Sequence, residues 1–233
     1  VIALGVAAHT VSVPGALDVT GLVNGGTLDT TLGTSGNTVW GASAGASLTT
    51  GAIDNTLIGA AAGDLLTTGD YSTAIGSNAL GGNVTGSRNT TIGRHSALVY
   101  TGSDLTAIGH NALSSAVSTG ELVAIGAYAG DTVTTGGYSV YIGQNADTTA
   151  GGASHQIMIG RQATSDSNYA ITLGSAATVT GANYGIAIGS SASVTGPGGV
   201  AIGVSAAGAS ATAGADTIAL GVAAHTVSVP GAL

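Results

Sequence analysis

Apolar and polar residues alternate over a four-residue phrase that recurs along most of the chain. Clear copies are TAIG at 73–76, VAIG at 123–126 and IAIG at 186–189. Because neighbouring side chains of a strand point to opposite faces, each phrase is expected to form one short strand that ends at its glycine. An alanine usually follows three residues after that glycine, as in GSNA at 76–79. The pattern predicts a chain of many short strands.

The glycines that end these phrases are almost regularly spaced. From Gly41 the successive steps in residue number are 18, 17, 17, 16, 17, 17, 17, 14, 15, 14 and 18. This spacing is too short for a βαβ unit and too long for tight hairpins, but it fits one coil of a solenoid. We therefore predict an all-β fold, a parallel β-solenoid or β-roll with coils of 14–18 residues. Glycine is expected where a side chain would block a turn or a neighbouring backbone, at Gly59, Gly76, Gly93, Gly109, Gly126, Gly143, Gly160, Gly174, Gly189, Gly203 and Gly221.

The apolar residue before each turn glycine is our candidate for the core. These residues fall at the same place in every coil, so we expect them to stack into one column inside the solenoid. The alanine three residues after the glycine would form a second, thinner row across a narrow interior. Because one coil cannot bury its own isoleucine, many coils or several bundled chains are expected. The predicted core row is Ile58, Ile75, Ile92, Ile108, Ile125, Ile142, Ile159, Leu173, Ile188, Ile202 and Leu220.

Composition supports β structure and argues against several functions. The 233 residues include 41 glycines and no cysteine, and charged residues make up only 6%. The formal charge is -8, with three arginines and no lysine, so binding to nucleic acid or docking on an anionic membrane is not expected. No apolar run reaches the ~18 residues of a membrane span, so we expect no membrane insertion of this segment.

Candidate catalytic and metal-binding residues are few. Surface positions are the simplest interpretation of the histidines, because a metal site needs three or four converging ligands. No G-x-S-x-G elbow accompanies a His/Asp pair, and carboxylates do not gather on one face, so an enzyme is not expected. We therefore predict no catalytic residues, no metal and no cofactor. The histidines are His9, His95, His110, His155 and His225.

Tyrosines supply nearly all the aromatic rings of the chain. Tyr138 and Tyr141 could form a small cluster with Tyr128. Such rings could stack on sugars, line contacts between chains or simply pack at turn corners. The sequence favours packing and leaves the other two roles open.

The stretch TAIGSNALGGNVTGSRNTTIGRHSAL at 73–98 resembles the head repeats of trimeric autotransporter adhesins of the YadA type. Similar repeats occur in phage tail-fibre-like proteins. The resemblance covers about residues 38–233 and implies a left-handed parallel β-roll in which three chains pack together. Most coils are longer than is usual in that family, and only the stretch 160–203 approaches the family length.

A much longer period is superimposed on the short one. The phrase IALGVAAHTVSVPGAL stands at 2–17 and again at 218–233, so Gly5 and Gly221 differ in number by 216, which is 221 minus 5. We interpret this interval as the length of a tandem unit, and two local copies of a capping or docking segment are the alternative. The predicted division is the end of a preceding solenoid block at 1–13, an inserted β-hairpin or variant coil at 14–37, a solenoid block at 38–216 and the start of the next unit at 217–233.

These expectations together describe a structural and adhesive segment of a long extracellular filament. It would be part of a cell-surface adhesin, a fibre or a hook shaft that attaches to cells or surfaces. Self-association is expected, as a trimer by the resemblance or as a higher-order bundle, with a cell-surface or matrix ligand that the sequence does not identify. The alternatives are a phage or virus tail-fibre module that binds surface glycan, and an ice-binding solenoid.

Overall fold

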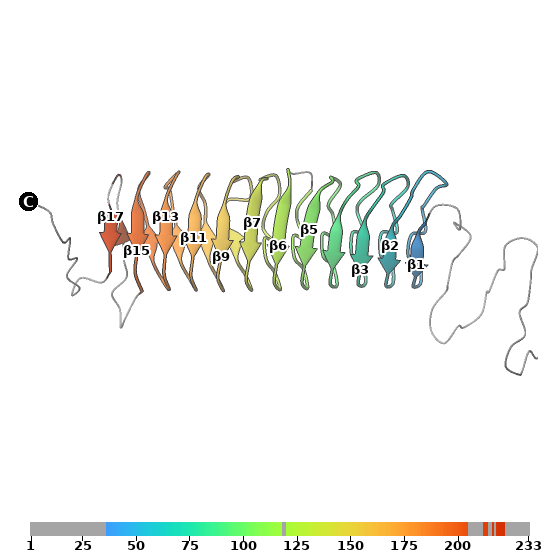
Figure 1. Cartoon of the computed structure of the whole chain (residues 1–233), viewed down its shortest axis with the longest axis horizontal. Helices are drawn as coiled ribbons and strands as arrows, with labels where there is room; N and C mark the ends of the chain where they lie inside the picture. Colours follow the sequence, from blue (N-terminus) through green and yellow to red (C-terminus); the bar gives the residue numbers. More distant parts are fainter. Residues whose placement is uncertain (1–35, 118–119, 205–211, 214–215, 217, 222–233) are drawn as a thin grey trace, which may run out of the picture.

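The chain winds into a parallel β-solenoid of short coils (Figure 1). The computed structural model describes residues 36–117, 120–204, 212–213, 216 and 218–221. Within these residues all regular structure is β, which confirms the predicted fold class. Most of the predicted segments at 1–13, 14–37 and 217–233 lie outside the described residues.

One long sheet takes a strand from every coil and runs the length of the solenoid. Its twelve strands pair in parallel in the order of the coils. Identical positions of the phrase pair across coils, for example Thr73 with Thr90 and Ile75 with Ile92. At ~4.8 Å per strand, the long sheet is roughly 53 Å long. The strands are β1 (Thr38–Trp40), β2 (Thr56–Ile58), β3 (Thr73–Ile75), β4 (Thr90–Ile92), β5 (Leu105–Ile108), β6 (Leu122–Ile125), β7 (Ser139–Ile142), β9 (Ile157–Ile159), β11 (Ile171–Leu173), β13 (Ile186–Ile188), β15 (Val200–Ile202) and β17 (Ile218–Leu220).

A second, shorter sheet lies along the C-terminal coils only. Its five strands also pair in parallel, and each comes from the half of the coil that follows the turn glycine. In the earlier coils, turns occupy the equivalent place. The strands are β8 (Asp147–Thr148), β10 (Thr164–Ser165), β12 (Thr178–Val179), β14 (Ser193–Val194) and β16 (Thr212–Ala213).

The predicted core row stacks in one column, as the strand register shows, but it does not fill the interior. Its members are half-buried or exposed, and Ile125 and Ile202 keep 38% and 41% of their surface. The core assignment is therefore wrong for the whole row, which consists of Ile58, Ile75, Ile92, Ile108, Ile125, Ile142, Ile159, Leu173, Ile188, Ile202 and Leu220.

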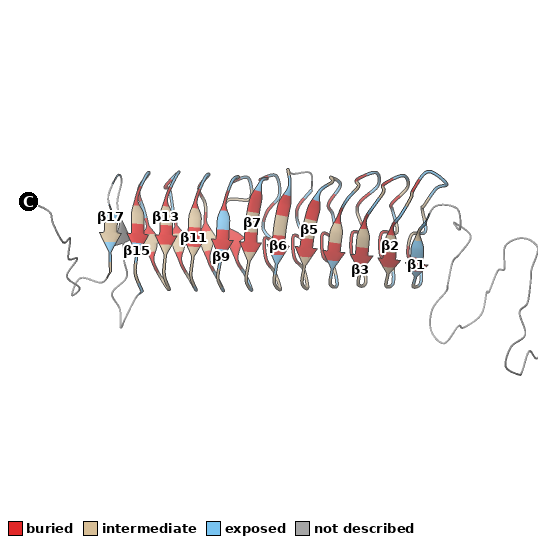
Figure 2. Cartoon of the chain, in the orientation of Figure 1, coloured by how far each residue is buried: buried red, intermediate tan, exposed pale blue. Residues whose placement is uncertain are grey.

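The residue in the middle of each strand points inward instead. Figure 2 shows these buried positions alternating with more exposed ones along the long sheet. Because side chains alternate in direction along a strand, only one of two neighbouring positions can face inward, but the alternation does not determine which one. The narrow interior decides it, because most coils leave room for only a small residue. The buried middle residues are Val39, Leu57, Ala74, Thr91, Ala107, Ala124, Tyr141, Met158, Thr172, Ala187 and Ala201.

Large middle residues are matched by glycine on the opposite wall. A Cβ on Gly63 would lie 2.9 Å from Cδ2 of Leu57, and one on Gly130 would lie 3.1 Å from Cδ2 of Tyr141. Such matching of large to small residues lets a coil hold a bulky side chain without leaving a void. The predicted row of alanines that follows the turn glycines lines this interior too, and Ala79 and Ala112 are fully buried.

The turn glycines also stack on one another, and their backbone explains why glycine is needed. Gly93 has φ +129°, a conformation that other residues rarely adopt. A Cβ there would lie only 2.4 Å from the carbonyl oxygen of Gly109 in the next coil. The close approach of successive turns therefore excludes any side chain.

Candidate functional site

One exposed edge of the solenoid carries a column of charged and aromatic side chains. The residue five positions before each turn glycine lies at this edge, just before a strand of the long sheet. We call this column the ridge. All its members are at least partly exposed; glycine holds the place at Gly36 and Gly198, and the members with a side chain are Asp54, Tyr71, Arg88, Asp104, Glu121, Tyr138, His155, Tyr169, Tyr184 and Asp216.

Four consecutive rings of the ridge form an aromatic stack. The ring centroids of Tyr138 and His155 are 5.2 Å apart, those of His155 and Tyr169 4.7 Å, and those of Tyr169 and Tyr184 5.0 Å. The planes are inclined by 27°, 23° and 8°. The spacing follows from the fold, since the ~4.8 Å rise between coils is close to the preferred stacking distance of aromatic rings.

The backbone holds these rings in an unusual conformation. Tyr138, His155 and Tyr169 have φ of 56°, 59° and 56°, a region that non-glycine residues seldom occupy. Hydrogen bonds to the preceding coil fix it, as where Tyr169 N–H donates to the carbonyl oxygen of Ser154 at 3.1 Å. The side chains are therefore presented outward by a rigid backbone.

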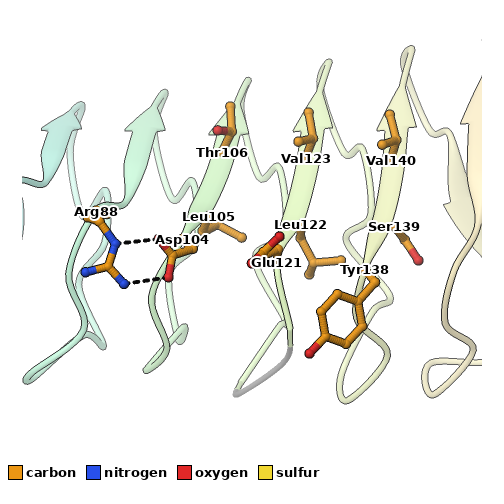
Figure 3. Close-up of a pocket in the computed structure, with 10 residues that line it drawn as sticks. All are labelled: Arg88, Asp104, Leu105, Thr106, Glu121, Leu122, Val123, Tyr138, Ser139 and Val140. Carbon is orange, nitrogen blue, oxygen red and sulfur yellow. Dashed lines mark hydrogen bonds and ion pairs between the residues drawn. The ribbon is translucent and has the colours of Figure 1, made fainter.

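A groove of about 570 Å³ opens beside the ridge across four coils (Figure 3). The guanidinium of Arg88 meets the carboxylate of Asp104 through two hydrogen bonds, Nε to Oδ1 at 2.6 Å and Nη2 to Oδ2 at 2.7 Å. The hydrogen bond from Arg88 holds the pKa of Asp104 below its usual value, and the same contact raises the pKa of Arg88. The pair thus adds no net charge to the lining of the groove.

The other end of the groove carries an acidic and an aromatic group. Glu121 is exposed and has no ion-pair partner among the described residues. Tyr138 comes from the next coil, and a Cβ on Gly120 would lie 2.7 Å from Cζ of its ring. The ring therefore rests over a glycine, with its neighbour His155 behind it in the stack. The remaining wall is formed by Leu105, Thr106, Leu122, Val123, Ser139 and Val140.

The predicted tyrosine cluster is wrong, because its three rings lie in different environments. Tyr141 is buried inside the solenoid, where its hydroxyl donates to Oε1 of Gln156 at 2.9 Å, and burial raises the pKa of Tyr141. Tyr128 meets His110 edge-on, with centroids 5.1 Å apart. Only Tyr138 of the three belongs to the ridge.

The histidines are dispersed along the part of the chain that the structure describes. His110 lies near Arg94, with 3.4 Å between Nε2 and Nη1. Burial and the charge of Arg94 lower the pKa of His95. His9 and His225 lie outside the described residues. No group of three or more potential metal ligands occurs among the residues described.

The ridge was not among the predicted sites, although the sequence contains a clear indication of it. The ridge residues stand five positions before successive turn glycines, which includes Tyr138, His155, Tyr169 and Tyr184 before four consecutive ones. Aligning the coils on glycine and reading each offset separately would have found this column.

Comparison with family models, with curated proteins and with solved structures gave no match to this chain. The class of architecture comes from the structure itself, which is a parallel β-solenoid built from tandem coils. Across the described ranges, no helix is long and apolar enough to span a membrane.

Proposed function

We propose that this chain is a structural and adhesive segment of an extracellular filament, and that copies associate through the outer face of the long sheet. We define the outer face by the two outward columns of that sheet. One column is the row before the turn glycines, and the other lies two residues earlier in each strand. The exposed isoleucine column of the outer face is the observation that carries this proposal.

Apolar residues dominate the outer face. Exposed members include Ile92, Ile125, Ile159 and Ile202, with 37–41% of their surface accessible. A continuous apolar strip of this kind usually marks a contact surface. Covering the exposed part of one isoleucine contributes about 1 kcal/mol, and the strip repeats it along the whole sheet.

A second copy of the chain is the partner that fits this strip best. Its own outer face has the same spacing between strands, so the side-chain rows of one copy can fit between those of the other over many coils. Charged side chains are absent from both columns in the described strands, so no buried charge opposes the contact. The resemblance to adhesin head repeats favours three chains.

The outer face becomes more apolar toward the C-terminal coils. The earlier column carries Thr56, Thr73, Thr90 and Thr106 in β2–β5. From β6 onward it carries only valine or isoleucine: Val123, Val140, Ile157, Ile171, Ile186, Val200 and Ile218. We therefore expect the C-terminal coils to make the stronger contact.

Ice binding is a second candidate, supported by the threonine column of β1–β5. Threonines at ~4.8 Å intervals on a flat sheet can order water. The threonines form a single column that ends at Thr106 in β5, whereas the column before the turn glycines stays isoleucine or leucine from β2 through to β17. Measurement of thermal hysteresis in dilute solution would detect this activity directly.

Light scattering and negative-stain imaging of the chain test the main proposal. We expect concentration-dependent assemblies that elongate along the solenoid axis. Replacing Ile125, Ile159 and Ile202 together by threonine keeps β-branched residues in the strands but removes apolar surface, so it should give monomers. A matched control is Val84, Val99 and Val117 to threonine, since these exposed valines lie outside the strands of the long sheet. A wild-type chain that stays monomeric at every concentration would overturn the proposal.

A further inference from the structure

We propose that the groove between Arg88 and Tyr138 binds the basic side chain of an extended peptide, a lysine ammonium or an arginine guanidinium. This deepens the adhesive part of the proposed function by naming the chemistry of a partner. It rests on the groove, the uncompensated carboxylate and the fixed aromatic ring, and it does not require the chains to associate.

Charge favours a cation in this groove. Arg88 is neutralised by its two hydrogen bonds to Asp104, which leaves the carboxylate of Glu121 as the net charge of the lining. The whole chain has a formal charge of -8, so the surrounding field also attracts cations. An anionic ligand would meet repulsion from both sources.

The aromatic ring of Tyr138 supplies the second contact that a cation needs. Ammonium and guanidinium groups are attracted to the face of an aromatic ring. Tyr138 keeps 60% of its surface exposed, while the stack with His155 fixes its orientation. Glu121 and Tyr138 occupy successive positions of the ridge, so one cation can reach both (Figure 3). A pre-positioned ring loses little entropy on binding.

The rest of the lining suits the apolar stem of a long basic side chain. Thr106, Val123 and Val140 belong to the outward column of β5–β7 and form one wall of the groove. Lysine and arginine commonly place their methylene groups along such surfaces while the charge stays in water. The groove is open and crosses four coils, which suits an extended segment.

A single site of this kind binds weakly, because exposed cation–π and carboxylate contacts are each small. The tandem unit predicted from the repeated phrase at 2–17 and 218–233 would present one groove per unit. Repetition along a filament converts weak sites into firm attachment to a partner with several basic residues. The proposal therefore favours a repetitive basic peptide.

Fluorescence anisotropy of the whole 233-residue chain with a labelled, end-blocked glycine–serine peptide carrying several lysines tests this inference. We expect saturable binding that weakens as salt is raised. The arginine version should bind too, and the glutamine version should bind about ten-fold or more weakly. Equal binding of the glutamine peptide would overturn the proposal. The proposal would also be overturned if a free diamine bound with the same affinity as the lysine peptide, or if a neutral oligosaccharide bound more tightly than that peptide.

Variants locate the site. E121Q removes the net charge and should weaken binding about five-fold. Tyr138→Leu should weaken it two- to five-fold or so, whereas Tyr138→Phe keeps the ring and should bind as the wild type does. Tyr184→Leu is the matched control, because Tyr184 ends the same stack far from the groove and is 64% exposed. Unchanged binding by E121Q would contradict the site.

The two proposals fail in different ways. A chain that binds the lysine peptide but never assembles overturns only the filament proposal. Thr106, Val123 and Val140 belong both to the groove and to the outer face, so assembly can cover the groove and peptide binding is measured at a dilution at which the chain is monomeric. A chain that assembles at higher concentration but does not bind the peptide as a monomer overturns only this inference.

Discussion

The N-terminal and C-terminal coils of this solenoid use the same strand phrase but build the rest of the coil differently. From Gly59 to Gly160 successive turn glycines differ in number by 16 or 17, and from Gly160 to Gly203 they differ by 14 or 15. The longer coils close with turns and have large residues such as Leu66 and Leu113 inside. The shorter coils close with a second strand over a core of alanine and valine.

Three of the five strands of the second sheet, β10, β12 and β14, come from these shorter coils. β8 and β16 come from the adjoining coils of 17 and 18 residues, so the second sheet extends one coil beyond the short ones at each end. Extra residues widen the coil, and the wider interior must then be filled by leucine or tyrosine. Short coils bring the two walls together, so alanine and valine are large enough to fill the space between them. The long sheet is unaffected by this change, and its register continues from β7 to β9 without a break.

Replacing a turn glycine should have the largest effect on the stability of the fold. The effect should be the same in both halves, because the column of turn glycines is common to them. A Cβ on Gly109 would lie 2.3 Å from the carbonyl oxygen of Gly126, and one on Gly189 would lie 1.9 Å from that of Gly203. Each glycine-to-alanine change should destabilise the fold by more than about 4 kcal/mol. Thermal and denaturant unfolding followed by circular dichroism would measure it.

Gly51 gives the matched control, since a Cβ there would find no atom nearer than 3.8 Å. Gly51→Ala should leave stability within about 1 kcal/mol of the wild type. A tolerated alanine at Gly109 or Gly189 would show that successive turns are further apart than described.

Core truncation should separate the two halves. Leu113 is fully buried in a long coil, and Leu113→Ala should cost about 3 kcal/mol, because the widened interior cannot collapse onto the space. Val194 is buried in a short coil, and Val194→Ala should cost only about 1.5 kcal/mol. Chemical denaturation of both variants in parallel would measure the difference. Equal costs would contradict an interior of different width.

A smaller effect is expected at the boundary between the halves, where Asp147 opens the second sheet. Burial raises the pKa of Asp147 to about 7, and the carboxyl of Asp131 beside it acts in the same direction. Thr132 N–H donates to Oδ2 of Asp147 at 3.0 Å and Thr148 N–H to Oδ1 at 2.8 Å. The folded state therefore holds a proton here that the unfolded chain releases at lower pH.

The sign of the pH dependence follows from that raised pKa. Its contribution to stability is complete below the unfolded pKa near 4 and is lost as pH rises through about 7. We expect the melting temperature to fall across this window by an amount equivalent to roughly 2 kcal/mol. Melting curves of D147N should show a weaker fall. D104N is the control, because the pKa of Asp104 is lowered, and it should keep the fall of the wild type.

Sequence alone predicted the repeating parts of this molecule well and the choice between faces badly. The spacing of the turn glycines is sufficient to predict parallel coils, since few folds require a glycine at such a regular interval. The column of isoleucines was also predictable, because Ile75 and Ile92 hold identical places in their phrases. Which way that column faces depends on the width of the interior, and so on Ala74 and the alanines opposite it. Hydrophobicity favours isoleucine inside, whereas volume favours alanine.

The ridge was predictable in position but not in chemistry. Tyr138 and Tyr169 recur at a fixed offset, so their column could be inferred. The pairing of Arg88 with Asp104, which leaves Glu121 uncompensated, depends on side-chain conformations that spacing does not determine.

Parallel pairing between coils also sets how the solenoid responds to tension. Hydrogen bonds between coils run along the axis, so a pull on the two ends loads the strands of the long sheet one after another, in series. Such an arrangement yields by peeling a single coil from an end, not by breaking all pairs together. One of the longer coils, once released, extends to roughly 55 Å in place of its ~4.8 Å rise. The rod can therefore lengthen under load and wind up again when the load is removed.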